Sequence, residues 1–284
     1  MSAVPADTTA LDLGEITLTF VPDGELRADP AVAYPAGHED IFTDGLDVVD
    51  EDGMLLLSIG AILVTAGTSR VLVDVGIGDR RIPLIRPGAS RDGYMGGGAL
   101  LRNLSALGVE PEQIDTILLT HLHADHVGWI GDGDATFPNA EYWVGEGEWQ
   151  YWIRPENSGG PVGPRPNELE IIGSRRRRLV DGAEPVDGIT AVDTAGHTPG
   201  HFGFAVRGTN ACAFVVGDAL HCPAEALRPD LAWVGDVDGG AAIRTRRNIA
   251  AHVRDTGAVL VGPHFPNAVF MEYSSSGLIP FATT

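Results

Sequence analysis

The chain has 284 residues, of which 44% are hydrophobic, and its formal net charge is −20. An acidic surface of this kind repels nucleic acid and anionic membranes, because phosphate binding needs basic patches. All 19 basic residues are arginine, which excludes Schiff-base chemistry and a lysine general base. The two cysteines, Cys212 and Cys222, are too few for a disulfide framework, so we expect free thiols.

The organisation of the chain is predicted to be simple. The first 13 residues lack the basic start and apolar core of a secretion signal, and no run approaches the ~20 apolar residues of a membrane helix. We therefore expect a cytoplasmic protein. No repeat or low-complexity block marks a boundary, so we expect a single domain over residues 1–284. The irregular N-terminal segment is a candidate contact of a homodimer.

Hydrophobic periodicity and turn residues predict the elements of the first half. In chain order we expect a strand at Glu15–Val21, a turn at Asp23-Gly24, an irregular segment Arg27–Asp52 holding the surface-loop residue His38, a hairpin of strands Met54–Thr65 and Arg70–Val75, an irregular segment Ile77–Gly98, a helix Ala99–Leu107 and a strand Ile114–Leu119. Alternating strands and helices favour a layered α/β arrangement.

The segment after Leu119 carries the strongest chemical signal, because three imidazoles and a carboxylate occur within six residues: His121, His123, Asp125 and His126. These are ligands that divalent ions such as zinc accept. In an extended segment His121 and His123 point the same way, and a helix beginning near Asp125 turns the next two side chains toward a second point. One short segment is therefore able to supply ligands to two neighbouring metals.

The second half is predicted from the same signals. We expect a strand at Glu141–Val144, a helix Glu146–Trp152, a proline-rich loop Arg154–Asn167, a helix face at Arg175–Arg178 paired with nearby acids, strands at Ile189–Thr194, Phe202–Val206 and Ala211–Val216, a helix Ala241–Asp255 and a strand Ala258–Val261. The loop is either a lid over a site or a passive surface insertion.

Three predicted strands of this half run into polar residues, namely His197, Asp218 and His264. Loops at one edge of a β scaffold are where functional groups collect, so we expect these side chains to meet. In the first half, Asp74 also ends a strand. It is either part of a plain turn or an acid that holds a metal-site residue in place. His201 and His252 are interpreted as structural.

These elements together resemble the metallo-β-lactamase superfamily over nearly the whole chain. The resemblance rests on His121-x-His123-x-Asp125-His126, the His197 loop, Asp218 and the late His264, all in the family's order. It implies an α/β fold, a four-layer αββα sandwich of two mixed sheets, with a dimetal site at one edge. The implied ligand sets are one metal held by His121, His123 and His197, a second held by Asp125, His126 and His264, and a bridge at Asp218.

The resemblance also implies hydrolysis. Metal coordination lowers the pKa of water from ~16 toward ~7, so a hydroxide shared by two metals attacks the substrate, and Asp125 is placed to shuttle a proton. No protein nucleophile is needed, so Cys222 has no required role. The same ligands accept zinc, manganese, iron or cobalt; two zinc ions are our expectation.

Departures from subfamily patterns narrow the substrate. True β-lactamases usually have a cysteine where Asp218 stands, flavodiiron oxidases a glutamate where His123 stands, and glyoxalase-type thioesterases and nucleases have basic parts that are absent here. The Gly217-Asp218-x-x-His221 run, with Arg228–Asp230, Asp236–Asp238 and Thr245–Arg247, looks similar to methyl parathion hydrolase-like enzymes in the lactonase branch.

His221 either hydrogen-bonds the substrate oxygen or merely lies beside the site. The sequence therefore predicts a metal-dependent hydrolase of small-molecule lactones or related esters, with side activity on aryl esters or phosphotriesters. A biosynthetic acyl thioesterase is the alternative within enzymes. A non-catalytic metal-binding scaffold is the alternative outside them.

Overall fold

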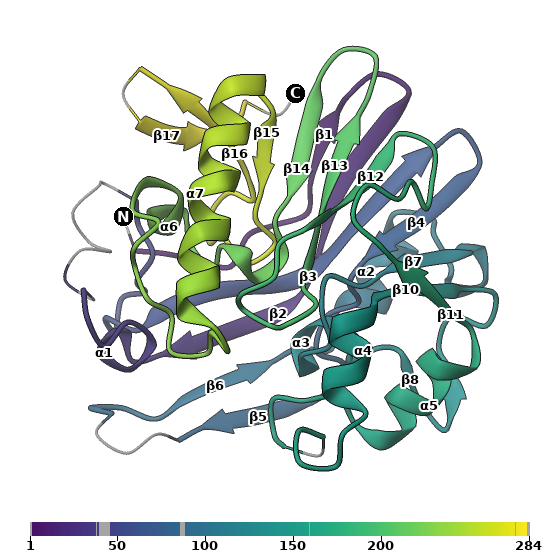
Figure 1. Ribbon diagram of the computed structural model, residues 1–284, viewed down its shortest axis with the longest axis horizontal. Helices are drawn as coiled ribbons and strands as arrows, with labels where there is room; N and C mark the ends of the chain where they lie inside the picture. Colours follow the sequence, from purple (N-terminus) through teal and green to yellow (C-terminus); the bar gives the residue numbers. More distant parts are fainter. Residues whose placement is uncertain are drawn as a thin grey trace.

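The computed structural model describes residues 2–37, 39, 46–85, 89–158, 160–275 and 277–282. His38, which we expect in a surface loop, lies outside these residues. Within them, two extended sheets pack face to face, and helices cover their outer faces (Figure 1). A small pair of strands, β8 (Gly131–Asp132) and β9 (Asp134–Ala135), lies apart from both sheets.

The larger sheet is organised around a long antiparallel hairpin of β2 (Ile16–Ala28) and β3 (Leu55–Ala66). In the described residues its order is β11-β10-β7-β4-β3-β2-β6-β5, and β1 also pairs with β2. The remaining strands are β1 (Thr9–Asp12), β4 (Ser69–Val73), β5 (Arg81–Leu84), β6 (Gly93–Gly96), β7 (Thr116–Leu118), β10 (Glu141–Gly145) and β11 (Arg176–Leu179). Parallel pairing of β4, β7, β10 and β11 makes the sheet mixed.

The smaller sheet has the order β12-β13-β14-β15-β16-β17 in the described chain. Its strands are β12 (Ile189–Asp193), β13 (Phe202–Arg207), β14 (Cys212–Val215), β15 (Val259–Val261), β16 (Phe270–Ser274) and β17 (Gly277–Pro280). Only β14 and β15 pair in parallel among these neighbours, because the long helix α7 (Gly239–Thr256) connects them. A crossover of this kind is what a parallel pair requires.

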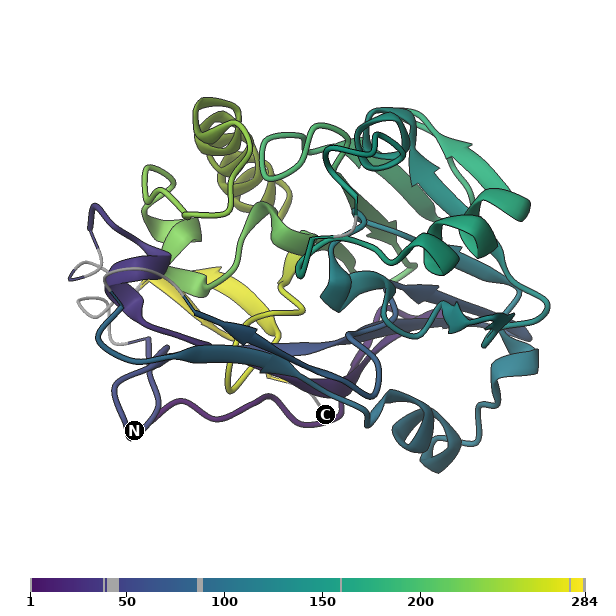
Figure 2. The same cartoon turned by 90° about the horizontal axis from the view of Figure 1, so that it is seen from below.

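Four apolar clusters make up the core of the described residues, and three of them form layers that alternate with the two sheets. Phe20, Ile62, Phe204 and Val261 belong to the cluster between the sheets. Outside the larger sheet lie α2 (Leu100–Ala106), α3 (Ala124–Val127), α4 (Glu146–Trp152) and α5 (Pro166–Ser174). Outside the smaller sheet lie α6 (Pro223–Leu227) and α7, as the two views show (Figures 1 and 2). The order of layers is therefore αββα, as predicted.

Three local predictions are wrong, and tertiary pairing explains each. Asp23 does not form a turn, because β2 continues past it with an irregular register against β3. The segment Ile77–Gly98 is not irregular throughout, since β5 and β6 form an antiparallel hairpin within it. The arginine cluster is a strand rather than a helix face: β11 pairs in parallel with β10. Its predicted acidic partners are present, since Arg177 binds Glu141.

Several strands and α-helices were not anticipated, namely β1, β8, β9, β16, β17, the helix α1 (Pro30–Ala33), α5 and α6. Each is short, and five of the eight contain proline or glycine. Among the described residues, no helix combines the length and apolar character needed to cross a lipid bilayer.

Candidate metal centre

The first ligand loop connects β7 to α3 and is held by a buried carboxylate. Asp74, at the end of β4, accepts hydrogen bonds from the Thr120 backbone N–H at 2.9 Å and from the Thr120 hydroxyl at 2.8 Å. It adopts a positive φ of 58°, which aspartate tolerates better than most residues. The loop therefore leaves the sheet in a fixed direction, with His121 and His123 converging at its tip.

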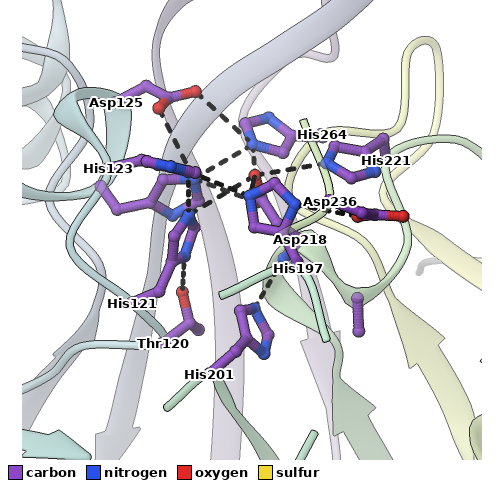
Figure 3. Close-up of polar contacts among 12 residues, drawn as sticks. Thr120, His121, His123, Asp125, His197, His201, Asp218, His221, Asp236 and His264 are labelled. Atoms are coloured by element: carbon purple, nitrogen blue, oxygen red, sulfur yellow. Dashed lines mark hydrogen bonds and ion pairs between the residues drawn. The ribbon is translucent and has the colours of Figure 1, made fainter. Parts of the chain in front are cut away.

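The first group of donors is formed by His121, His123, His197 and Asp218. The Nε2 atoms of His121 and His197 each lie 2.9 Å from Nδ1 of His123. The Oδ2 atom of Asp218 lies 3.6 Å from His121 Nε2 and 3.3 Å from His197 Nε2. Four donor atoms thus surround one point at the edge of the sandwich (Figure 3).

The second group is formed by Asp125, His126 and His264. The two imidazole Nε2 atoms are 3.2 Å apart, and the Asp125 oxygens lie 3.8 Å from His126 and 3.7 Å from His264. The Oδ1 atom of Asp218 is 3.0 Å from His126 Nε2 and 2.9 Å from His264 Nε2. Asp218 therefore presents one oxygen to each group.

This donor set fits divalent ions. Zinc–nitrogen bonds of ~2.0–2.1 Å at tetrahedral angles place two imidazole nitrogens about 3.3 Å apart, close to the separations seen within each group. The Oδ1 atom of Asp218 is buried, and the two imidazole nitrogens beside it, at 3.0 and 2.9 Å, do not donate an aligned hydrogen bond to it. A buried carboxylate oxygen without a donor is costly, and a cation compensates for it.

The outward-facing nitrogens of four histidines are also held. His121 Nδ1 lies 3.0 Å from the Thr120 hydroxyl, and His126 Nδ1 lies 2.8 Å from Asp74. His197 Nδ1 lies 3.2 Å from Asp236 Oδ1, and His264 Nδ1 lies 2.6 Å from the Ser58 carbonyl. Partners of this kind fix the tautomer and the ring orientation of a metal-binding histidine.

The pKa values of the histidines are shifted in opposite directions in the two groups. Burial and neighbouring imidazoles lower the pKa of His123 and that of His197 to about 3, so both are neutral and able to bind a cation. Burial also lowers the pKa of His126, but the carboxylates of Asp218, Asp74 and Asp125 outweigh it and raise that pKa well above its usual value. Two carboxylates besides Asp218, those of Asp74 and Asp125, therefore face the second group and favour a cation there.

His221 and His201 flank Asp218 in different ways. His221 Nε2 is 3.5 Å from Asp218 Oδ2, its ring stacks on Trp233 at 4.1 Å, and it lines the cavity described below. His201 Nε2 accepts the Asp218 backbone N–H at 3.0 Å, so the Nδ1–H of His201 donates to Thr194. His201 thus contacts the backbone at Asp218, and its structural role stays a prediction. His252 lies on the exposed side of α7.

A cavity of about 300 Å³ opens over the two groups. Its floor includes His123, Asp125, His197, Asp218 and His264, and its walls are mostly apolar: Leu26, Ala28, Val32, Ala33, Leu57, Leu84, Met95, Trp152, Val162, Trp233, Val234 and Val237. The proline-rich loop contributes Val162, whose carbonyl accepts the Ala124 backbone N–H. The enclosed space accommodates an apolar small molecule next to the donors.

Sequence reasoning placed all seven candidate ligands, and the structure brings them together. It missed Glu148, whose buried carboxylate accepts the backbone N–H of Leu122 at 2.9 Å and that of Gly200 at 3.3 Å. It also assigned no role to Glu225 or Arg246. A glutamate within an apolar helical pattern was the available signal for Glu148.

Comparison with known proteins identifies the family. A family model described as the metallo-beta-lactamase superfamily matches residues 57–264, which include every candidate ligand. The chain belongs to the metallo-beta-lactamase superfamily.

Curated relatives within the superfamily include the N-acyl homoserine lactonase AttM of Azorhizobium caulinodans. The two sequences are 32% identical over 176 residues, which is 58% of this chain. The match spans 63% of the relative, so it covers less than two thirds of that protein's length.

Solved structures of the superfamily resemble the whole chain. Hydrolase AbOPH is 27% identical, covers 99% of both chains and has a TM-score of 0.78. AidC, described as a dizinc quorum-quenching lactonase, is 22% identical, covers 98% of this chain and 99% of its own, and has a TM-score of 0.77. At that identity the second likeness establishes the shared fold.

Proposed function

We propose that this protein is a dinuclear metal-dependent hydrolase that opens lactones or related esters. The observation that carries the proposal is that Asp218 joins two groups of imidazole and carboxylate donors at the floor of a largely apolar cavity. The description of AttM and AidC as lactonases supports the substrate class. We further propose zinc in both positions, since neutral imidazole and carboxylate suit it.

Bound in these two groups, the ions would activate water near neutral pH and polarise the substrate carbonyl. The chain itself would supply the ligands His121, His123 and His197 for one ion, and Asp125, His126 and His264 for the other. Asp218, which presents one oxygen to each group, would serve both ions.

Two further roles, proton transfer and orientation of the substrate, would fall to Asp125 and His221. Asp125 lies on the cavity floor, and we assign it the movement of a proton between the nucleophile and the leaving group. His221 faces the same cavity, and its ring is fixed by the stack on Trp233. We assign it a hydrogen bond to the substrate oxygen.

The apolar walls have a separate function. They exclude bulk water and receive the apolar part of the substrate, since buried apolar area contributes ~25 cal/mol per Å² to binding. The same walls fit an aryl ester or a phosphotriester, so we propose these as side activities. A biosynthetic acyl thioesterase is the second candidate, because its acyl chain would occupy the same cavity. Cytoplasmic location, homodimer formation and a single domain stay predictions from the sequence.

The test is proton release by the zinc-loaded protein with four substrates: an acyl-homoserine lactone, an aryl ester, an acyl thioester and a phosphotriester. We expect the highest kcat/KM on the lactone, with loss of turnover in the His123→Ala/Asp218→Ala variant. The matched control is His252→Ala, which changes an exposed histidine on α7. Highest turnover on the thioester would replace the lactonase proposal. No turnover on any substrate with metal bound would refute the substrate class.

A further inference from the structure

Arg246 is a fully buried arginine, located on α7 behind the metal centre. Charged side chains are rarely buried completely unless each polar atom has a partner. Among the described residues it ranks first by volume of those side chains that are almost completely inaccessible. Its position therefore requires a structural or functional explanation.

The guanidinium of Arg246 contacts four separate segments. Its Nε donates to the Ala219 carbonyl at 3.1 Å, and its Nη1 donates to the Leu231 carbonyl at 2.7 Å. Its Nη2 donates to Asp236 Oδ2 at 2.7 Å and lies 3.3 Å from Glu225 Oε1. A planar fork with fixed donor directions is the group that can reach all four oxygens at once.

Asp236 connects this guanidinium to the first group of metal donors. Its Oδ2 accepts from Arg246. Its Oδ1 lies 3.2 Å from Nδ1 of His197, and Figure 3 shows these two side chains side by side. The opposite nitrogen of that imidazole, Nε2, faces His123 and Asp218. The rotation of the His197 ring is therefore set by a carboxylate that Arg246 holds.

Glu225 connects the same guanidinium to His221. Its Oε1 faces Arg246, while its Oε2 accepts the His221 backbone N–H and lies 3.5 Å from His221 Nδ1. The Ala219 carbonyl, a third contact of Arg246, belongs to the residue directly after Asp218. A single intervening residue thus separates Arg246 from His197, from Asp218 and from His221, and these residues are Asp236, Ala219 and Glu225 respectively.

We propose that Arg246 is a positioning residue that couples the metal centre to His221, by fixing Asp236 behind His197 and Glu225 behind His221. The substrate arm of this proposal rests on the proposed function, whereas its metal arm does not. A residue that only stabilised the fold would not require its two carboxylate partners to face two different site histidines.

The test compares Arg246→Lys with Arg247→Lys, the neighbouring exposed arginine on the same helix. Lysine keeps the positive charge but is a single point donor that does not reach four oxygens. The measurements are zinc affinity by chelator competition, the visible spectrum of the cobalt-loaded protein, kcat and KM on the lactone, and Tm. Asp236→Asn and Glu225→Gln are measured in the same way.

We expect Arg246→Lys to lower zinc affinity and kcat, each by about 10- to 100-fold, as loss of groups behind metal ligands does. We expect Asp236→Asn to reproduce the affinity loss with a changed cobalt spectrum, and Glu225→Gln to lower kcat at unchanged zinc affinity. Arg247→Lys is expected to match the native protein in every measurement.

A folded Arg246→Lys protein with native zinc affinity, cobalt spectrum and kcat would overturn the proposal, even if its Tm were lower. If this variant does not fold, the two carboxylate variants decide, and native behaviour in both would overturn it. A native protein that binds zinc but hydrolyses no substrate would refute the proposed function alone. The affinity and spectral losses would then still support Arg246 as the residue that positions the centre.

Discussion

Glu148 offers the sharpest test of how the two halves of the site are held together. It lies on α4, is fully buried, and accepts hydrogen bonds from three groups. These are the Leu122 N–H between His121 and His123, the Gly200 N–H, and the indole N–H of Trp152. One carboxylate therefore fixes both ligand loops and a wall of the cavity.

The magnitude follows from those three donors. In Glu148→Ala each loses its acceptor, and a buried donor without a partner costs about 1–3 kcal/mol. Water entering the vacated space would satisfy part of them, so we expect a loss of about 3–5 kcal/mol in the free energy of unfolding. Glu148→Gln keeps one acceptor oxygen and turns an NH₂ group toward one donor, so we expect about 1–3 kcal/mol.

The assay is urea unfolding of the metal-free protein, analysed by linear extrapolation. Gln150→Ala is the matched control, because it is an exposed residue of the same helix and is expected to change stability by less than about 0.5 kcal/mol. We also expect Glu148→Ala to weaken zinc binding by about 10-fold or more. A Glu148→Ala protein as stable as the Gln150→Ala control would refute the reasoning.

Three further predictions concern the metal and the thiols. Asp74→Asn, which weakens the acceptor behind His126, should lower zinc affinity by about 10- to 100-fold in chelator competition, and an unchanged affinity would show that this contact is incidental. Removal of metal by a chelator should lower Tm, and zinc at 100 times its Kd should restore about 2.7 kcal/mol of stability; a Tm that does not respond would contradict binding to the folded state. Burial raises the pKa of Cys222 to about 12, so its thiolate is scarce below that pH. In the native protein a thiol reagent at pH 8 to 10 should therefore modify Cys212 alone, and equal reaction of both thiols would disprove the burial of Cys222.

The candidate ligands could be named from the sequence because their signal is local or follows a strand. His121 to His126 occupy six consecutive positions, and His197, Asp218 and His264 each come shortly after an apolar run that forms a strand. The order of these residues also matched a known family. The four-layer fold followed from that match, and the strand and helix periodicities agreed with it.

The features that the sequence did not predict depend on contacts between distant segments, which hydrophobic periodicity does not encode. Asp23 reads as a turn, yet its buried carboxylate accepts from the backbone of Ile77 and Leu100, far along the chain. Arg176 and its neighbours read as a charged helix face, yet they pair beside β10. Arg246 lies in a stretch that resembles a subfamily, but only the packing of α7 shows that it is buried and which carboxylates it contacts.

The contact between β3 and the His264 loop, at the edge where the two sheets meet, bears on the order in which the chain folds. The backbone N–H of Ser58, on β3, donates to the His264 carbonyl, and the His264 ring returns a contact to the Ser58 carbonyl. His264 is separated from His126 by 138 positions, so closing this contact is a long-range event that is slow compared with local structure. With the ligands that we propose, the second metal site of a newly synthesised chain is complete only after β15 has packed into its sheet and brought His264 to His126. A chain with both sites occupied by metal has therefore already folded.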